Sequence, residues 1–261
     1  MNLNLTQKTA LVCGSTQGLG YASAVELALL GCNVILMARN QQKLEQAVAT
    51  LDTSKNQQHS FLVADFTDTE AVKNTILNYV STNTVHILVN NTGGPAGGTI
   101  MDAEAEQFIA TFNNHLINNH NLTKAVVLGM KAAGFGRIIN IISTSVKIPL
   151  AGLGVSNTIR GAVAAWAKTL ASELGIFNIT VNNVLPGFTQ TSRADYVIAK
   201  KATDSGTTKA AVLAALENEI PAGRIGKPEE FGAAVAFLCS PAAAYINGIN
   251  LPVDGGRLGC L

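Results

Sequence analysis

Three glycines near the start of the chain are spaced so that backbone amides could bind a phosphate. Gly14, Gly18 and Gly20 form the pattern Gly-x-x-x-Gly-x-Gly after an apolar run, and an amphipathic stretch follows them. The first glycine permits a tight turn, and the others let the backbone approach a pyrophosphate and let the helix pack closely on the strand. The helix N-terminus adds unpaired N–H groups and a partial positive charge. The pattern predicts a dinucleotide site, and an ordinary loop is the alternative.

The end of the second apolar run indicates which dinucleotide would bind. An acidic side chain there would hold the adenosine ribose 2′-hydroxyl, whereas an arginine suits a 2′-phosphate. The run ends in Met37-Ala38-Arg39-Asn40, so Arg39 predicts NADP(H) rather than NAD(H). A solvated arginine at a strand end is the alternative interpretation.

Short apolar runs alternate along the chain with amphipathic stretches that would position this turn. The runs are rich in Val, Ile and Leu and do not alternate with polar residues, which is typical of strands buried on both faces. They lie at Thr9–Cys13, Asn33–Ala38, Ser60–Ala64, Ile87–Asn90, Arg137–Ile142, Thr180–Leu185 and Ile249–Val253. The helical stretches lie at Gly18–Leu30, Gln41–Thr50, Asp68–Val80, Asp102–Ala133, Gly152–Leu174 and Pro228–Leu238. This alternation predicts an α/β fold, a Rossmann-type doubly wound parallel sheet of about seven strands with helices on both faces.

One segment, residues 189–221, breaks the alternation. It is long and mixed in character, and we expect an insertion that covers the C-terminal edge of the sheet as a substrate lid. Open α/β sheets bind their ligands at that edge. The length of 261 residues fits a single dinucleotide-binding domain, residues 1–261, that includes this insertion.

The composition limits the classes of partner. Charged residues make up 13% of the chain, against roughly 25% in an ordinary soluble protein, which favours burial of surface against other copies of the chain. The net charge of +1 gives no electrostatic case for nucleic acid or a membrane surface. The sequence contains neither a run of ~18 apolar residues nor a signal-peptide pattern, so we expect a cytoplasmic protein. Its four cysteines are expected to be small buried hydrophobes, and no Cys/His cluster indicates a metal site.

Further motifs follow the glycine turn in order along the chain. They are Ala64-Asp65, Asn90-Asn91-Thr92-Gly93, residues 136–143 ending in Ser143, residues 186–191 beginning Pro186-Gly187, residues 223–230, and Val253-Asp254-Gly255-Gly256. With these motifs, essentially the whole chain resembles the short-chain dehydrogenase/reductase family, particularly its 3-oxoacyl-acyl-carrier-protein reductase-like members. The resemblance implies that Asp65 and Phe66 flank the adenine, that Asn91 lies by the adenosine-side ribose, and that Thr189 contacts the nicotinamide amide. The full set of expected cofactor-binding residues is Gly14, Ser15, Gln17, Gly18, Leu19, Gly20, Arg39, Asp65, Phe66, Asn91, Gly93, Arg160, Pro186, Gly187 and Thr189.

The catalytic residues of that family match this chain only in part. The family uses a Ser, a Tyr commonly thirteen residues later, a Lys four further on, and usually a helical Asn. Ser143 fits the first position, but Ser156 and Arg160 occupy the Tyr and Lys positions, and His115 occupies the Asn position. A Tyr has a pKa of ~10, whereas an aliphatic hydroxyl is a much weaker acid and would need help to donate a proton. The expected catalytic residues are therefore Ser143, Ser156, Arg160 and His115.

Each replacement has an alternative interpretation. His115 would titrate near neutrality, with a pKa lowered by a neighbouring Arg160 so that a neutral imidazole relays the proton through Ser156 or a water, or it could lie at a subunit contact. Arg160 could pair with ribose hydroxyls through its planar fork, or form a salt bridge on the helix surface. Tyr196, in the inserted segment, could replace the missing acid, although a loop tyrosine is more often a packing residue.

Two functions of different class remain open. The first is an NADP(H)-dependent oxidoreductase that reduces a ketone, 3-oxoacyl-like and free or carrier-bound, to an alcohol or runs the reverse reaction. The second is a catalytically inactive dinucleotide-binding sensor or scaffold protein, which the missing tyrosine favours. In either case the resemblance implies a homotetramer, built from the helices equivalent to 102–133 and 152–174 and completed by the last strand region.

Overall fold

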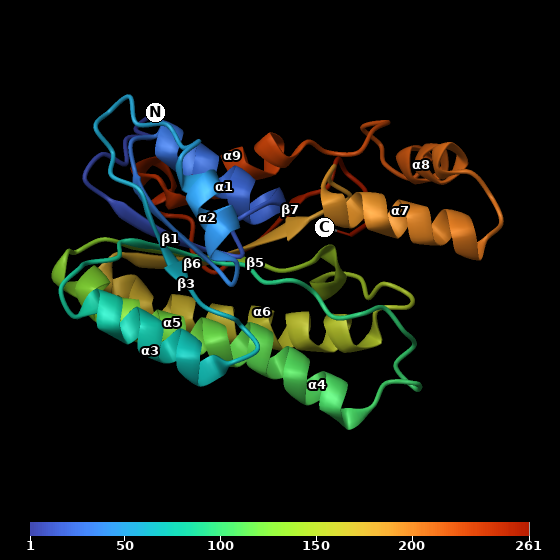
Figure 1. Cartoon of the computed structure of the whole chain (residues 1–261), viewed down its shortest axis with the longest axis horizontal. Coiled ribbons are helices and arrows are strands. Elements are labelled where there is room, and N and C mark those ends of the chain that lie inside the picture. Colours follow the sequence, from blue (N-terminus) through green and yellow to red (C-terminus); the bar gives the residue numbers. More distant parts are fainter. Residues whose placement is uncertain (261) are drawn as a thin grey trace.

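The central element is one parallel sheet of seven strands in the order β3-β2-β1-β4-β5-β6-β7 (Figure 1). The structure is a computed structural model and describes residues 1–260. The strands are β1 (Thr9–Cys13), β2 (Asn33–Ala38), β3 (Ser60–Val63), β4 (Ile87–Asn90), β5 (Gly136–Ile141), β6 (Ile179–Pro186) and β7 (Asn250–Val253). The order reverses between β1 and β4, and such a switch point opens a crevice at the carboxyl ends of the strands. The predicted fold class is confirmed.

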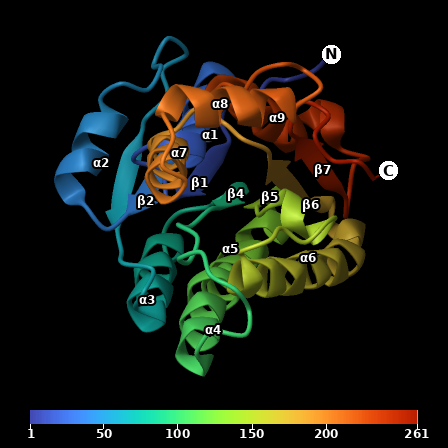
Figure 2. The ribbon, with the colours of Figure 1, turned by 90° about the vertical axis from the view of Figure 1, so that its right-hand side faces the viewer.

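Helices cover both faces of this sheet, as Figure 2 shows. On one face lie α1 (Gly18–Leu29), α2 (Gln41–Val48) and α9 (Pro228–Cys239), and on the other lie α3 (Thr69–Val80), α4 (Ala105–Phe112), α5 (Asn118–Ala132) and α6 (Gly154–Leu174). Successive residues of the central strands enter opposite cores. In β1, for example, Ala10 and Val12 pack toward α1, while Leu11 and Cys13 pack toward α3 and α5. Burial on both faces explains why the strand segments lack polar alternation.

The expected helix at 102–133 is interrupted. The chain forms α4, then one π-helical turn at Asn113–Ile117, then α5. A π turn inserts one extra residue into the helix and often occurs at a functional site. His115 lies within this turn.

The segment at 189–221 contains two helices, α7 (Ser192–Asp204) and α8 (Lys209–Asn218), which lie beside the carboxyl ends of the strands (Figure 1). They pack on each other through Ile198, Ala202, Val212 and Leu216, a small cluster separate from the two cores against the sheet. Few apolar contacts thus tie this pair of helices to the rest of the chain.

Two expectations from composition can be compared with the fold. Cys13, Cys32 and Cys239 are buried, and burial raises the pKa of Cys13 and Cys239 to about 12. Cys260 is exposed, so the expectation of burial is wrong for that residue. Across residues 1–260, none of the helices is both long enough and apolar enough to cross a bilayer.

Candidate active site

A cavity of about 870 Å³ lies at the crevice beyond the carboxyl ends of the strands. Its wall includes the glycine turn, the ends of β2 and β3, and the loops after β4 and β5. The connection from β6 into α7 and the first turns of α6 complete it. One end therefore contains the predicted dinucleotide motif, and the other contains Ser143, Ser156 and Arg160. The volume lies within the range typical of sites for small molecules and cofactors.

The glycine turn admits no side chain at two of its positions. Gly14 has φ +55°, and a Cβ on it would lie 2.7 Å from the backbone oxygen of Asn91. A Cβ on Gly20 would lie 2.4 Å from the backbone oxygen of Gly14. The Asn91 side chain holds the turn by donating to the backbone oxygens of Gly14 (3.1 Å) and Cys13 (3.3 Å). The predicted role of these glycines in close packing fits this geometry.

The N-terminus of α1 is free to receive an anion. Within α1, Gly18–Leu29, the Gln17 side chain at the N-cap makes no capping hydrogen bond, and the first turn holds no acidic residue. By contrast, the Asn40 side chain caps α2 and the Asp68 side chain caps α3. Gln17, Gly18 and Leu19 line the cavity. Unpaired helical N–H groups facing a cavity are what a pyrophosphate requires, so the residues present fit a dinucleotide.

Two cations border the nucleotide end. Arg39 and Lys43 are both exposed and line the cavity, at the end of β2 and in the first turn of α2. The sequence reasoning missed Lys43, although its place one turn into the helix after Arg39 could have indicated it. Asp65 and Phe66 line the same end. Hydrogen bonds from the Thr67 backbone and hydroxyl, with a smaller effect from Arg39, lower the pKa of Asp65.

The residues expected to contact the cofactor do not all reach the cavity. Among the described lining residues, Ser15 and Gly20 are absent. The Ser15 hydroxyl is buried and accepts a hydrogen bond from the Met37 backbone N–H at 3.0 Å, so it joins the glycine turn to β2. Thr16, which the prediction left out, lines the cavity in its place. The other expected residues, Gly93, Pro186, Gly187 and Thr189 among them, do line it.

Ser143 and Ser156 both line the chemical end of the cavity. Ser143 ends the segment after β5, and its hydroxyl oxygen accepts from the backbone N–H of Ser145 at 3.1 Å. That contact leaves the hydroxyl proton of Ser143 available to a ligand. Ser156 lies in the first turn of α6, next to Asn157, whose amide donates to the backbone oxygen of Leu150 at 2.8 Å. Asn157 thus holds the loop that precedes the helix.

Arg160 is buried, with 9% of its surface exposed. One guanidinium nitrogen, Nη1, donates to the backbone oxygen of Ile141 at 2.9 Å. Burial lowers the pKa of Arg160 to about 10, so the side chain stays charged at neutral pH. None of the ion pairs formed among residues 1–260 includes Arg160. The alternative interpretation of Arg160, a salt bridge on the helix surface, is therefore wrong.

His115 lies behind the cavity wall and not in it. Only 2% of the residue is exposed, and its Nδ1 is hydrogen-bonded to the Thr92 hydroxyl. Thr92 and Asn114 line the cavity, but His115 is not among the described lining residues. Burial, and secondarily the charge of Arg160, lowers the pKa of His115 to about 2. The expectation that this imidazole titrates near neutrality is wrong, and so little exposed surface leaves it no role in a subunit contact.

Tyr196 does not approach the cavity. It is 59% exposed on α7, while Arg193 and Val197 on the same helix line the wall. The Arg193 guanidinium lies 5.8 Å from the centre of the Tyr196 ring and donates to the backbone oxygen of Pro95 at 3.5 Å. The hypothesis that Tyr196 replaces the missing acid is contradicted by this placement.

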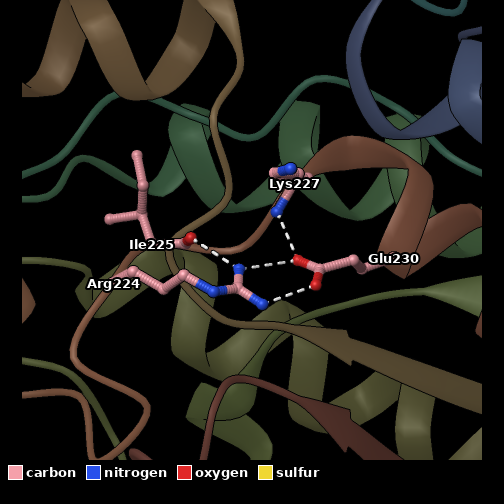
Figure 3. Close-up of polar contacts among 4 residues, drawn as sticks. All are labelled: Arg224, Ile225, Lys227 and Glu230. Carbon is pink, nitrogen blue, oxygen red and sulfur yellow. Dashed lines mark hydrogen bonds and ion pairs between the residues drawn. The ribbon is translucent and has the colours of Figure 1, made fainter.

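A surface ion pair holds the wall that carries Thr189. Backbone hydrogen bonds join Gly226 to Phe188 (2.9 Å) and to Gln190 (2.8 Å) on either side of Thr189. Figure 3 shows how the loop containing Gly226 is fixed: Arg224 donates two hydrogen bonds to Glu230, at 2.6 and 2.9 Å, and the Lys227 backbone donates to the same carboxylate. The arginine lowers the pKa of Glu230 to about 2.

Comparisons with known proteins agree with this geometry. A family model described as enoyl-(acyl carrier protein) reductase matches residues 14–257. The 3-oxoacyl-(acyl-carrier-protein) reductase FabG of Vibrio cholerae is 35% identical over 257 residues, covering 97% of this chain and 98% of the relative. Dehydrogenase/reductase SDR family member 4 of Oryctolagus cuniculus is 33% identical, with 97% and 94% covered. The crystal structure of L-sorbose reductase from Gluconobacter frateurii, complexed with NADPH and L-sorbose, superposes with a TM-score of 0.93 at 31% identity and covers all of both chains.

Proposed function

This chain belongs to the short-chain dehydrogenase/reductase family, and from that premise we propose that it is an NADP(H)-dependent oxidoreductase that interconverts a ketone, 3-oxoacyl-like, and an alcohol. The observation that carries the proposal is the single cavity that joins a phosphate-binding turn to Ser143, Ser156 and Arg160. The relatives support the reaction class, since FabG is named a reductase of 3-oxoacyl groups and the sorbose reductase was solved with NADPH.

The nucleotide end of the cavity would hold the cofactor. The free N–H groups at the start of α1 suit the pyrophosphate, and Arg39 with Lys43 suits a 2′-phosphate. Asp65 and Phe66 would flank the adenine, Asn91 and Gly93 the adjacent ribose, and Pro186, Gly187 and Thr189 the nicotinamide amide. When bound, NADP(H) would supply or accept the hydride.

The chemical end would orient the carbonyl with hydroxyls and a fixed positive charge. The hydroxyl of Ser143 can donate a hydrogen bond to the carbonyl oxygen, and Ser156 lines the same end of the cavity. Arg160 can bind ribose hydroxyls or substrate but cannot pass a proton onward, because it remains charged. The open cavity admits water, which we propose as the source of the proton.

His115 takes the part of a positioning residue in this proposal. Because its imidazole stays neutral, it neither stores nor releases a proton at the working pH. Its hydrogen bond to Thr92 fixes the orientation of a hydroxyl that does line the cavity. The interruption of the helix at Asn113–Ile117 places the ring behind that hydroxyl.

We further propose that residues 189–221 act as a substrate lid within one domain and that the chain forms a homotetramer. Arg193 in the first turn of α7 donates to the backbone oxygen of Pro95 in the loop after β4, a contact that a lid would make. Ile109 on α4 and Leu128 on α5 expose most of their surface, and the half-buried Trp166 on α6 contacts the His120 ring. These apolar side chains on helices of one face support an interface between copies.

Titration of the purified protein with NADPH, followed by a panel of β-keto esters, tests the proposal. We expect saturable binding, seen in nicotinamide fluorescence, and a loss of reduced-nicotinamide absorbance when a suitable ketone is added. The second function, an inactive dinucleotide-binding protein, is favoured by the serine at position 156. Binding without oxidation across esters, sugars and free oxo acids would support that function instead.

A further inference from the structure

We propose that the substrate carries its own carboxylate and that Arg160 binds it, so that the chain reduces a small free oxo acid rather than an uncharged ester or thioester. This inference rests on the proposed function and names the substrate class of the same site. It begins from a buried positive charge for which the chain itself supplies no negative partner.

The charge of Arg160 is uncompensated within the described structure. Taking a guanidinium out of water is costly unless an anion and further hydrogen bonds replace the solvent. Among the described residues that line the cavity, the only carboxylate is Asp65. Asp65 follows β3 and Arg160 lies beside β5, four strand positions away in the sheet order, a separation of about 19 Å. His115, whose pKa is lowered by burial and by the charge of Arg160, is neutral and offers no charge.

The unused donors of Arg160 face the cavity. Nη1 is bound to Ile141, while Nη2 lies toward the loop after β4, 3.9 Å from the position of a Cβ built on Gly94. Gly94 and Arg160 both line the cavity. The ribose hydroxyls of a nicotinamide nucleotide can accept hydrogen bonds from a guanidinium, but they bring no charge. A carboxylate brings the charge and matches the planar fork of an arginine with two parallel hydrogen bonds.

The neighbouring hydroxyls fit the rest of such a substrate. Ser156 and Arg160 are separated by one turn of α6, about 6 Å along the helix axis. A carbonyl held by Ser143 and Ser156 would then lie within a few bonds of a carboxylate held by Arg160. This spacing favours 2-oxo and 3-oxo carboxylates of short chain length. In the redox step the carboxylate is unchanged, the ketone carbon gains a hydride, its oxygen gains a proton from water, and the nicotinamide is oxidised.

Besides Arg39 at the nucleotide end, two other arginines line the cavity, and both are less suited to this role. Arg257 is already paired with Glu219 at 2.6 Å. Arg193 is exposed at the rim, where solvent screens its charge. The buried arginine therefore provides the strongest discrimination between a charged and an uncharged substrate.

Paired substrates test the inference directly. The kcat/KM of the wild-type protein with NADPH is measured for 3-oxobutanoate and 2-oxobutanoate and for the methyl ester of each. A hydrogen bond to a charged group contributes enough to give a preference of about 10- to 100-fold for the acid. Isothermal titration of the NADP⁺-loaded protein with 3-oxobutanoate and its methyl ester measures the same preference without turnover, because the oxidised cofactor has no hydride to transfer. Equal kcat/KM values for acid and ester would overturn the inference. Reduction of the ester alone would also overturn it, but would leave the proposed function standing.

Variants assign the preference to a residue. In Arg160→Gln the acid-to-ester ratio should fall to near one, and Arg160→Lys should keep part of it. If Arg160→Gln instead raises the Kd of NADPH and weakens acid and ester equally, Arg160 binds only the ribose and the inference fails. If Arg193→Gln removes the preference, the rim arginine is the anion site and the inference fails. Should Arg160→Gln not fold, the wild-type ratios and the Arg193→Gln ratio still decide the question. Absence of NADPH binding by the wild type would contradict the proposed function itself.

Discussion

The two ends of the cavity are formed by different kinds of chemical group. The nucleotide end consists of backbone amides, glycines that exclude side chains, and the exposed cations Arg39 and Lys43. The chemical end depends on buried polar groups, with Arg160 enclosed beside β5 and His115 sealed behind Thr92. Backbone geometry at the first end leaves a signature in residue spacing. Burial at the second end decides charge and pKa, and spacing does not reveal burial.

The largest expected effect lies at the glycine turn. Gly20→Ala places a Cβ 2.4 Å from the backbone oxygen of Gly14. Since this distance is too short, the turn must shift away from the pyrophosphate position. We expect the affinity for NADPH to fall by more than about 100-fold, because several backbone hydrogen bonds to phosphate are lost together. Fluorescence titration measures the change. Gly161→Ala on α6, where open space surrounds the position, is the matched control; normal NADPH binding by Gly20→Ala would refute this account of the turn.

The second comparison restores the family residues at the chemical end. Ser156→Tyr combined with Arg160→Lys supplies an acid of pKa ~10 next to a cation, and a placed general acid contributes at least about 100-fold. We therefore expect a gain of that order in reduction of neutral β-keto esters, measured as NADPH oxidation. The single variant Ser156→Phe provides the ring without the hydroxyl. No gain in a double variant that folds and binds NADPH would show that the rest of the pocket does not accept these esters.

A smaller effect concerns the choice of cofactor. Arg39→Asp removes a cation from the 2′-phosphate position and introduces a group suited to a 2′-hydroxyl. The preference for NADPH over NADH should invert, with a loss of about 10- to 100-fold in NADPH affinity. Kd values at physiological salt provide the measurement, and Lys43→Gln should reduce the preference less. Equal affinity of the unaltered protein for the two cofactors would contradict the assignment.

The smallest effect separates stability from catalysis at His115. Its pKa is about 2 in the fold and ~6.5 when unfolded, so below pH 6.5 the unfolded chain binds a proton that the folded chain does not. Stability should therefore fall with decreasing pH, by ~2 kcal/mol between about pH 6.5 and about pH 5. Urea unfolding at both pH values should show this loss in the wild type, and His115→Asn should lack that part of it. A pH profile of kcat that changes shape near neutrality in His115→Asn would show instead that the imidazole titrates during the reaction.

The sequence was informative wherever local backbone chemistry decides the structure. The apolar runs predicted every strand, and Gly14, Gly18 and Gly20 predicted the turn, because Gly14 and Gly20 lie against main chain and Gly18 has φ +59°. The π turn at Asn113–Ile117 was not predictable, since no glycine or proline marks it. The burial of His115 and the inward-facing hydroxyl of Ser15 were not predictable either, because both depend on long-range packing.

A single-turnover experiment with isotopic label tests the central claim most directly. The protein is mixed with NADPH deuterated at the transferred position and with 3-oxobutanoate or its methyl ester, and the alcohol is analysed by mass spectrometry. If the nucleotide end and the chemical end serve one reaction, the label appears on the carbinol carbon of the product in proportion to the NADPH oxidised. Bound NADPH that keeps its label in the presence of both these substrates would contradict the account and identify the chain as a dinucleotide-binding protein without reductase chemistry.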